Sequence, residues 1–186
     1  GFYGVDIFFV ISGYLISKII ISEYEIKKKF SYLDFYERRM RRILPLLFFV
    51  LLTTLIAGYF LLFPSAYSDS AKSIIYSIFF SSNIFFFLSG QAYDALNSLA
   101  IPLLHTWSLS VEEQFYIFFP FLIIFLFTKV RSKIIKIFTI IIIFSLIFSN
   151  LGSFFFESLN FYILPSRLWE LLIGSVYFFY ENVCHP

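Results

Sequence analysis

Residues 43–63 form a run of 21 residues without a single charged side chain. A helix needs about 20 largely apolar residues to cross a bilayer, so this run is long enough to span one. Residues 5–22 form a second apolar run. Hydrophobic residues make up 60% of the 186 residues and charged residues 14%, whereas soluble domains are about 25% charged. The sequence therefore excludes a soluble globule and predicts an all-α polytopic transmembrane helix bundle.

Further apolar runs cover residues 73–88, 107–128, 134–148 and 168–180, and no internal repeat or β pattern is present. The run 73–88 is short, and serines recur at helical spacing before and within it, at positions 70, 73, 77 and 81. Such a stripe of small polar residues is expected to pack against another helix. The single cysteine, Cys184, excludes an internal disulfide.

The positive charges are sorted along the chain. Seven of the 14 Lys and Arg lie in residues 27–42, and four more lie in residues 129–136. The positive-inside rule places both clusters in the cytoplasm. Both clusters adjoin apolar runs, whereas a nucleic-acid site needs a basic face on a soluble domain, so we expect no nucleic-acid partner.

Two cytoplasmic clusters require an even number of crossings between them, but three apolar runs lie there. One interpretation is that the run 73–88 does not cross and is re-entrant, which is permitted where it is buried in protein. Residues 105–113 then begin at the outer face. The alternative is that the second basic cluster breaks the rule, in which case residues 105–113 begin at the inner face.

Four arginines in five residues precede the run 43–63. On a helix, Arg38, Arg41 and Arg42 lie on one face at three- and four-residue spacing, and Arg39 lies beside them. One interpretation is an anchor that fixes the depth of the span. The other is an anion site, since guanidinium groups bind phosphates with two parallel hydrogen bonds.

Residues 105–113 carry a second set of polar residues at the start of an apolar run. Ser110 followed by Glu113 fits a capping box, which leaves Glu112 without a local structural role. If the segment is helical, His105 and Glu112 share a face about 10 Å apart and could flank a substrate. Alternatively, His105 beside Trp107 is an interfacial residue.

Two further charged positions are candidates. Asp6 at the head of the first apolar run either caps the helix or pairs with a buried histidine or arginine. Glu170 lies three residues after Arg167, which predicts a local ion pair. No His/Cys cluster exists, so no metal site is predicted. These patterns fit a membrane transferase with an anionic donor, and equally a transporter of anionic solutes.

Four segments resemble motifs of the acyltransferase 3 family, in the family's order. Residues 4–16, GVDIFFVISGYLI, resemble its GVDxFFVISGFLI signature, and residues 35–44 resemble FYxRRxRRIL. Residues 82–83, 89–90 and 102–116 resemble its SN…SG…PLLHTWSLSVEEQFY stretch, and residues 164–174 resemble LPxRxWELLxG. The resemblance extends over nearly the whole sequence.

The resemblance implies a multi-pass enzyme of the inner (cytoplasmic) membrane that O-acylates a bacterial surface glycan. Acyl-CoA, commonly acetyl-CoA, is then the co-substrate and no cofactor is needed. The acceptor is a sugar hydroxyl of lipopolysaccharide, peptidoglycan or exopolysaccharide. The family also has a functional RxxR motif, which both Arg38/Arg41 and Arg39/Arg42 fit in this sequence.

In the family, the key histidine lies in a membrane helix before the GVDxFF signature. Residues 1–186 are therefore expected to form a partial acyltransferase domain that lacks the first membrane helix and the later ones, and to be inactive alone. Glu112 and His105 are the catalytic candidates within this sequence, with Trp107, Glu113, Asp6 and Glu170 as further site residues. The alternative function is a non-catalytic transporter of glycan or anionic solute.

Overall fold

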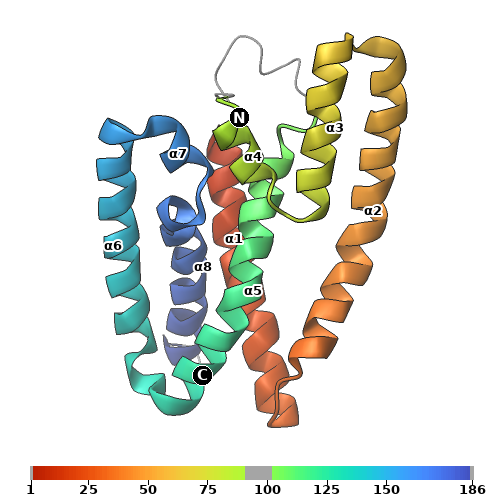
Figure 1. Ribbon diagram of the computed structural model, residues 1–186. Helices are drawn as coiled ribbons and strands as arrows, with labels where there is room; N and C mark the ends of the chain where they lie inside the picture. Colours follow the sequence, from red (N-terminus) through yellow and green to blue (C-terminus); the bar gives the residue numbers. More distant parts are fainter. Residues whose placement is uncertain (1, 91–101, 185–186) are drawn as a thin grey trace. The chain divides into compact units, whose positions relative to one another are not determined.

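The computed structural model describes residues 2–90 and 102–184, and this part of the chain is helical without strands (Figure 1). Its α-helices are α1 (Phe2–Lys27), α2 (Tyr32–Leu61), α3 (Pro64–Ile78), α4 (Ser82–Leu88), α5 (Thr106–Lys129), α6 (Ile134–Phe155), α7 (Glu157–Tyr162) and α8 (Leu164–Cys184), with a 3₁₀ helix η2 (Arg131–Lys133) before α6. The chain divides into two compact units: Gly1–Phe30 with Gln114–Pro186 (the first unit), and Ser31–Glu113 (the second unit).

Four helices in the described residues are long and apolar enough to cross a membrane, which confirms the predicted membrane fold. They cover Tyr3–Lys27, Tyr32–Leu61, Thr106–Lys129 and Arg131–Phe155. Two of them separate the basic clusters, an even number as the positive-inside rule requires. The run 73–88 is divided between α3, of 15 residues, and α4, of seven. Neither reaches the length of a span.

In the first unit, α8 packs along α1 on one side and α6 on the other (Figure 1). Two glycines allow α1 and α8 to approach closely. A Cβ on Gly13 would lie 1.8 Å from the carbonyl oxygen of Leu171, and a Cβ on Gly174 would lie 1.9 Å from that of Val10. Small residues at such crossings are typical of membrane helix pairs.

Aromatic rings fill the core of the same unit. Phe119 of α5 contacts Phe138 of α6, and Phe138 in turn contacts Phe179 of α8. Phe127 links this cluster to α1, since its ring lies 5.8 Å from Tyr24 and 6.4 Å from Phe179. The high aromatic content of the sequence therefore supplies the packing between helices.

In the second unit, α2 packs against α3. The core there includes Leu47 and Leu51 of α2, Ile74 of α3 and Leu103. The predicted serine stripe is confirmed on α3: Ser70, Ser73 and Ser77 are all buried. Ser81 lies beyond the end of α3 and bonds to the carbonyl of Tyr76.

The helices extend beyond the apolar runs of the sequence. The helix that carries the run 43–63 begins at Tyr32, where the Ser31 hydroxyl caps it by accepting the N–H of Asp34. Pro45 therefore lies inside α2. The segment between the runs 134–148 and 168–180 is also largely helical, because α6 continues to Phe155 and α7 follows.

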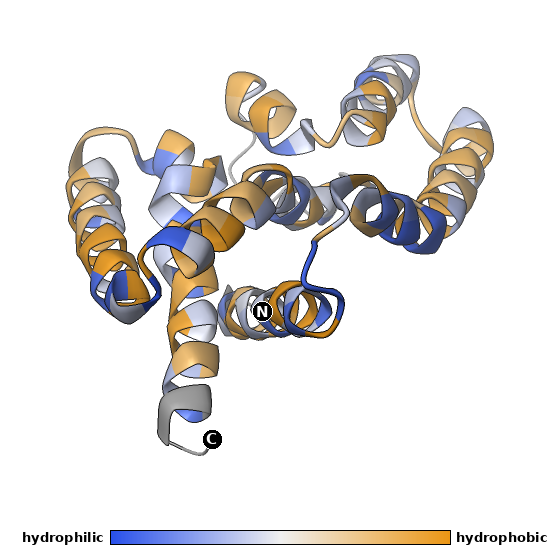
Figure 2. Ribbon diagram, turned by 90° about the horizontal axis from the view of Figure 1, so that it is seen from below, coloured by the Kyte–Doolittle hydropathy of each residue, from blue (hydrophilic) through white to orange (hydrophobic). Residues whose placement is uncertain are grey.

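Hydrophobic residues run along most of each helix, and the connection from α1 into α2 is hydrophilic (Figure 2). That connection and the first turns of α2 hold the larger basic cluster.

Candidate functional site

The arginine segment is helical, as the spacing predicted. Within α2, Arg38, Arg41 and Arg42 are all exposed, which agrees with one shared face. Arg41 contacts Glu37 of the preceding turn at 2.6 Å. Three guanidinium groups are thus presented to solvent directly before an uncharged span.

Arg39 differs from its neighbours. Its Nη2 donates to Oε1 of Glu113 at 2.8 Å, and the two side chains are 19% and 3% exposed. A buried carboxylate requires such a partner, because an unpaired charge away from water costs several kcal/mol. The four arginines therefore divide into an exposed set and one that is partly buried against α5.

The predicted capping box at Ser110 and Glu113 is wrong. The N–H groups of Thr106 and Trp107 bond to the carbonyls of Leu103 and Leu104, so α5 begins at Thr106. Ser110 lies inside the helix, where no N-terminal N–H group is left for its hydroxyl to cap.

The Ser110 hydroxyl instead connects α5 to α4. It lies 2.8 Å from the hydroxyl of Ser82 and accepts the Ser82 N–H at 3.2 Å. The Thr106 hydroxyl lies 2.9 Å from that of Ser82 and 3.1 Å from that of Ser77. This hydroxyl network, formed by Ser77, Ser82, Thr106 and Ser110, holds α3, α4 and α5 together within the second unit.

His105 and Glu112 differ in their exposure to solvent. His105 lies in the turn before α5 and is exposed, whereas Glu112 is buried within α5. Trp107 is also buried, so it packs inside the protein and does not stand at an interface with solvent. His105 therefore precedes the first residue of α5, and the shared face of His105 and Glu112 stays a prediction.

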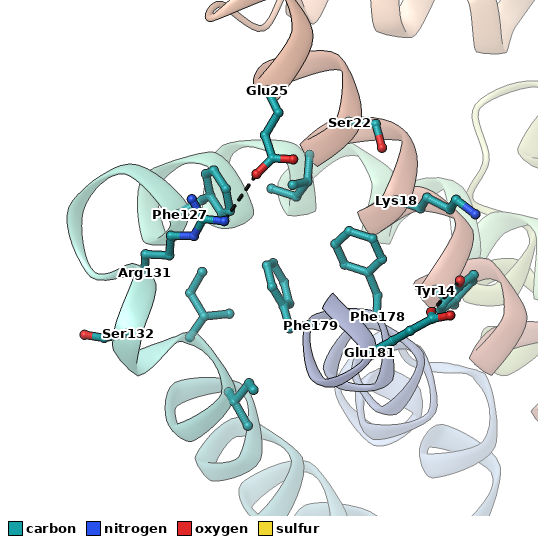
Figure 3. Close-up of a pocket in the computed structure, with 13 residues that line it drawn as sticks. Tyr14, Lys18, Ser22, Glu25, Phe127, Arg131, Ser132, Phe178, Phe179 and Glu181 are labelled. Atoms are coloured by element: carbon teal, nitrogen blue, oxygen red, sulfur yellow. Dashed lines mark hydrogen bonds and ion pairs between the residues drawn. The ribbon is translucent and has the colours of Figure 1, made fainter. Parts of the chain in front are cut away.

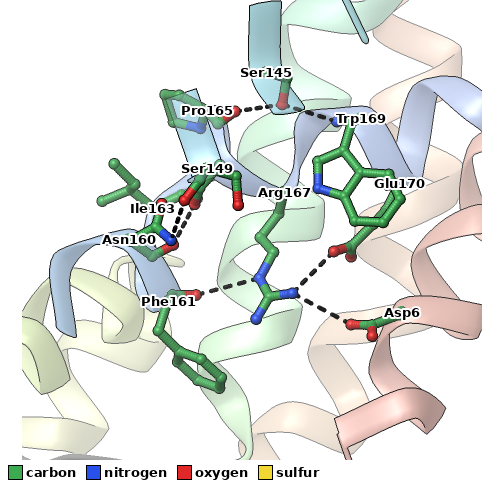
Figure 4. Close-up of polar contacts among 11 residues, drawn as sticks. Asp6, Ser145, Ser149, Asn160, Phe161, Ile163, Pro165, Arg167, Trp169 and Glu170 are labelled. Atoms are coloured by element: carbon green, nitrogen blue, oxygen red, sulfur yellow. Dashed lines mark hydrogen bonds and ion pairs between the residues drawn. The ribbon is translucent and has the colours of Figure 1, made fainter. Parts of the chain in front are cut away.

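A second charged cluster lies in the first unit, where α1, α7 and α8 meet (Figure 4). Arg167 Nη1 lies 2.9 Å from Glu170 Oε1 and 3.3 Å from Asp6 Oδ1. The guanidinium group also lies over the ring of Phe161, 5.0 Å from its centroid. The predicted local ion pair and the predicted arginine partner for Asp6 are both confirmed.

Hydrogen bonds fix the segment that presents Arg167. The Ser166 hydroxyl donates to the carbonyls of Asn160 and Ile163. The Ser145 hydroxyl of α6 donates to the carbonyl of Pro165 at 2.6 Å and accepts the N–H of Trp169 at 3.1 Å (Figure 4). The turn into α8 is thereby held against α6.

We call Asp6, Arg167 and Glu170 the Arg167 cluster. One of its carboxylate oxygens has no hydrogen-bond partner among the described residues. Two carboxylates and one guanidinium group give the cluster a formal charge of −1. Glu170 is 1% exposed, and its Oε2 atom has no hydrogen-bond partner among the described residues. A buried carboxylate oxygen in this state can accept a hydrogen bond or a proton from a hydroxyl group.

Sequence reasoning missed Lys18, which lies inside the first candidate span. The signal was present in the sequence, because a lysine within an apolar run is costly and usually marks a cavity or a functional site. No group of three or more His, Cys, Asp or Glu side chains in residues 2–90 and 102–184 is placed to hold a metal ion.

Comparisons with known proteins identify the relatives of this chain. It is 42% identical to the O-acetyltransferase OatA of Staphylococcus aureus over 135 aligned residues. The aligned segment covers 72% of this chain and 22% of OatA. It is 38% identical over 127 residues to the peptidoglycan O-acetyltransferase OatA of Listeria monocytogenes, covering 68% of the chain and 20% of that protein. An uncharacterized protein of Haemophilus influenzae is 38% identical over 187 residues, covering 96% of the chain and 75% of that protein.

No solved structure matches the chain. The chain spans about a fifth of the length of the OatA relatives. The family model described as an acyltransferase domain matches residues 1–181, which include all four motif segments and both charged clusters. The chain therefore belongs to the acyltransferase 3 family.

Proposed function

We propose that this chain is part of a membrane O-acetyltransferase that transfers an acetyl group from acetyl-CoA to a sugar hydroxyl of a cell-surface glycan. The observation that carries the proposal is the exposed set of Arg38, Arg41 and Arg42 at the start of α2. Relatives named O-acetyltransferase and the family match support the reaction class. By the positive-inside rule, this arginine set lies at the cytoplasmic face of the inner membrane.

The donor half of the reaction needs phosphate recognition more than chemical activation. A thioester is already reactive, so the protein must hold the CoA phosphates and orient the acyl group. Each charge-assisted hydrogen bond from Arg38, Arg41 or Arg42 contributes about 1.5–3 kcal/mol to donor binding. Glu37, which contacts Arg41 in an exposed pair, is displaced at small cost.

The acceptor half needs a group that receives the hydroxyl proton as the sugar oxygen bonds to the acetyl carbon, and that returns this proton to the group that releases the acetyl. Glu170 is a carboxylate with a buried oxygen available for such a hydroxyl, and Arg167 and Asp6 fix its position. The Arg167 cluster lies at the end of α1 and α8 opposite to Lys27, which is the extracytoplasmic end on this topology.

Glu112 is a second proposed carboxylate for the reaction, because it is buried near the start of α5. His105 is the proposed contact for the donor or acceptor at the exposed turn before α5. The reaction uses acyl-CoA as a co-substrate and no further cofactor. The acceptor class is a surface glycan such as lipopolysaccharide, peptidoglycan or exopolysaccharide, of which peptidoglycan appears in the name of one relative.

Mass spectrometry of surface glycans tests this function. Cells with the full-length gene, without it, and with Arg38→Ala/Arg41→Ala or the control Lys136→Ala are compared. Deletion is expected to remove O-acetyl groups from one glycan, and the double arginine variant to reduce them strongly. Lys136 is exposed at the start of α6, so its variant should match the wild type.

Two outcomes contradict the proposal. Unchanged acetylation after deletion rules out the enzyme. A lower amount of surface glycan with normal acetylation per sugar indicates a transporter.

A further inference from the structure

A pocket of about 750 Å³ opens within the first unit, between α1, the end of α5, η2, α6 and α8 (Figure 3). Its volume falls within the range of about 300–1,000 Å³ typical of small-molecule sites. We call it the α1/α8 pocket. Its lining combines apolar and aromatic side chains with a few charged ones, as such sites usually do. The lining residues on which the argument rests are Lys18, Glu25, Phe127, Arg131, Phe178 and Glu181.

Lys18 is the least expected member of this lining. It lies nine residues before Lys27, about 13 Å along the axis of α1 and thus inside the candidate span. A cation at that depth normally faces a partner or a water-filled cavity. In residues 2–90 and 102–184 Lys18 makes no ion pair, and its ammonium group lies 5.9 Å from the ring centroid of Tyr14. The pocket therefore contains a cation available to an anionic ligand.

Arg131 supplies a second cation. Its guanidinium group lies 4.4 Å from the ring centroid of Phe127 and pairs with Glu25 at 3.2 Å. Both partners of that pair are well exposed, at 70% and 49%. Exposed pairs contribute little stability, so a ligand phosphate can replace Glu25. A phosphate also allows Arg131 to form two parallel hydrogen bonds.

Aromatic rings lie between the two cations. Figure 3 shows Phe178 and Phe179 in the middle of the pocket, with Arg131 on one side and Lys18 on the other. Phe178 and Phe179 are held edge to face, 5.2 Å apart. The carboxylate of Glu181 accepts a hydrogen bond from the Tyr14 hydroxyl at 2.8 Å, so it is already engaged. Such rings offer stacking and edge contacts to a planar heterocycle.

The helix ends around this pocket are basic. Lys27 ends α1, and Arg131 and Lys133 belong to η2. The positive-inside rule places these ends in the cytoplasm, where an acyl-CoA donor is present. We propose that the α1/α8 pocket binds a phosphate ester attached to an aromatic ring, the nucleotide part of the acyl donor. This proposal rests on the proposed function.

A phospholipid headgroup offers the same phosphate chemistry without the ring, so the experiment separates these two sources. Full-length protein is placed in phosphatidylcholine nanodiscs, and the dissociation constant of acetyl-CoA is measured by calorimetry. The variants are Lys18→Gln and Arg131→Gln, with Lys72→Gln as the control. Lys72 is an exposed lysine of the second unit that contacts Asp69 at 3.0 Å. The second probe is S-acetylpantetheine, which lacks the nucleotide, and the third is phosphatidylglycerol added to the nanodiscs.

Each pocket variant is expected to weaken acetyl-CoA binding about tenfold, the loss of one charge-assisted contact. Binding of S-acetylpantetheine should stay the same in all variants, and Lys72→Gln should match the wild type. Lys18→Arg should restore most of the acetyl-CoA affinity, which a merely misfolded protein would not do.

Two results overturn the proposal. Acetyl-CoA affinity that is unchanged in both pocket variants excludes the nucleotide from this pocket. Unchanged acetyl-CoA affinity together with weaker phosphatidylglycerol binding in these variants assigns the pocket to a lipid. In either case the proposed function still stands if Arg38→Ala/Arg41→Ala lowers acetyl-CoA binding and glycan acetylation, and it fails separately if deletion of the gene leaves glycan acetylation unchanged.

Discussion

The ion pair between Arg39 and Glu113 should be a measurable determinant of stability. Arg39→Gln leaves the Glu113 carboxylate, which is 3% exposed, without its guanidinium partner. Loss of one partner of a buried pair costs about 3–5 kcal/mol. Glu113→Gln should cost less, about 2–3 kcal/mol on the same scale, because Arg39 is 19% exposed and keeps other contacts.

A double-mutant cycle measures the pair itself. Free energies of unfolding of full-length protein in mixed detergent micelles are compared for wild type, both single variants and Arg39→Gln/Glu113→Gln. The double variant should lose about 1–3 kcal/mol less than the sum of the single losses. The exposed pair of Asp69 and Lys72 provides the control cycle, with an expected coupling below about 1 kcal/mol. Additive losses at Arg39 and Glu113 would refute the inferred buried pair.

Three further outcomes are expected. Gly13→Ala should destabilise the pairing of α1 with α8 by about 2–3 kcal/mol in the same assay, since a Cβ would lie 1.8 Å from the Leu171 carbonyl oxygen; an unchanged unfolding energy would contradict the close crossing. Ser82→Ala should cost about 1–3 kcal/mol through lost hydroxyl contacts with Ser110 and Thr106, whereas a stabilised variant would exclude the hydroxyl network. Glu112→Gln should greatly lower acetyl transfer while expression is maintained, and full activity would remove Glu112 from the proposed site.

The membrane architecture could be predicted from the sequence because span length and charge sorting are local properties. The uncharged run 43–63 requires a lipid environment wherever it occurs. The serine stripe likewise indicated a packed face at helical spacing, and Ser73 and Ser77 are buried. Such features depend on neighbours within a few turns.

The start of α5 could not be predicted, because it depends on contacts of the turn before it. Ser110 and Glu113 match a capping box in sequence, yet the backbone bond from Thr106 to Leu103 begins the helix at Thr106, so Ser110 lies inside it. The sequence therefore assigned Glu113 to a cap, whereas its contact with Arg39 gives it a distinct structural role.

The ion pairs could be predicted from the sequence only where the two residues are close in the chain. Arg167 and Glu170 are three residues apart, so helical spacing alone predicted their contact. The partners Arg39 and Glu113 are 74 residues apart, and Asp6 and Arg167 are 161 apart. No local pattern specifies such pairs, because they form only when distant helices pack.

The most direct test of the proposed acetyl transfer uses full-length protein in liposomes that have ¹³C-acetyl-CoA on the face carrying the basic clusters and muropeptide on the other. Mass spectrometry then measures labelled O-acetyl groups on the muropeptide. The account predicts label with wild-type protein and strongly reduced label with Arg38→Ala/Arg41→Ala, while Lys136→Ala keeps wild-type transfer. Absence of label from the muropeptide, and from lipopolysaccharide or exopolysaccharide offered in its place, with intact protein in the liposomes, would contradict the account.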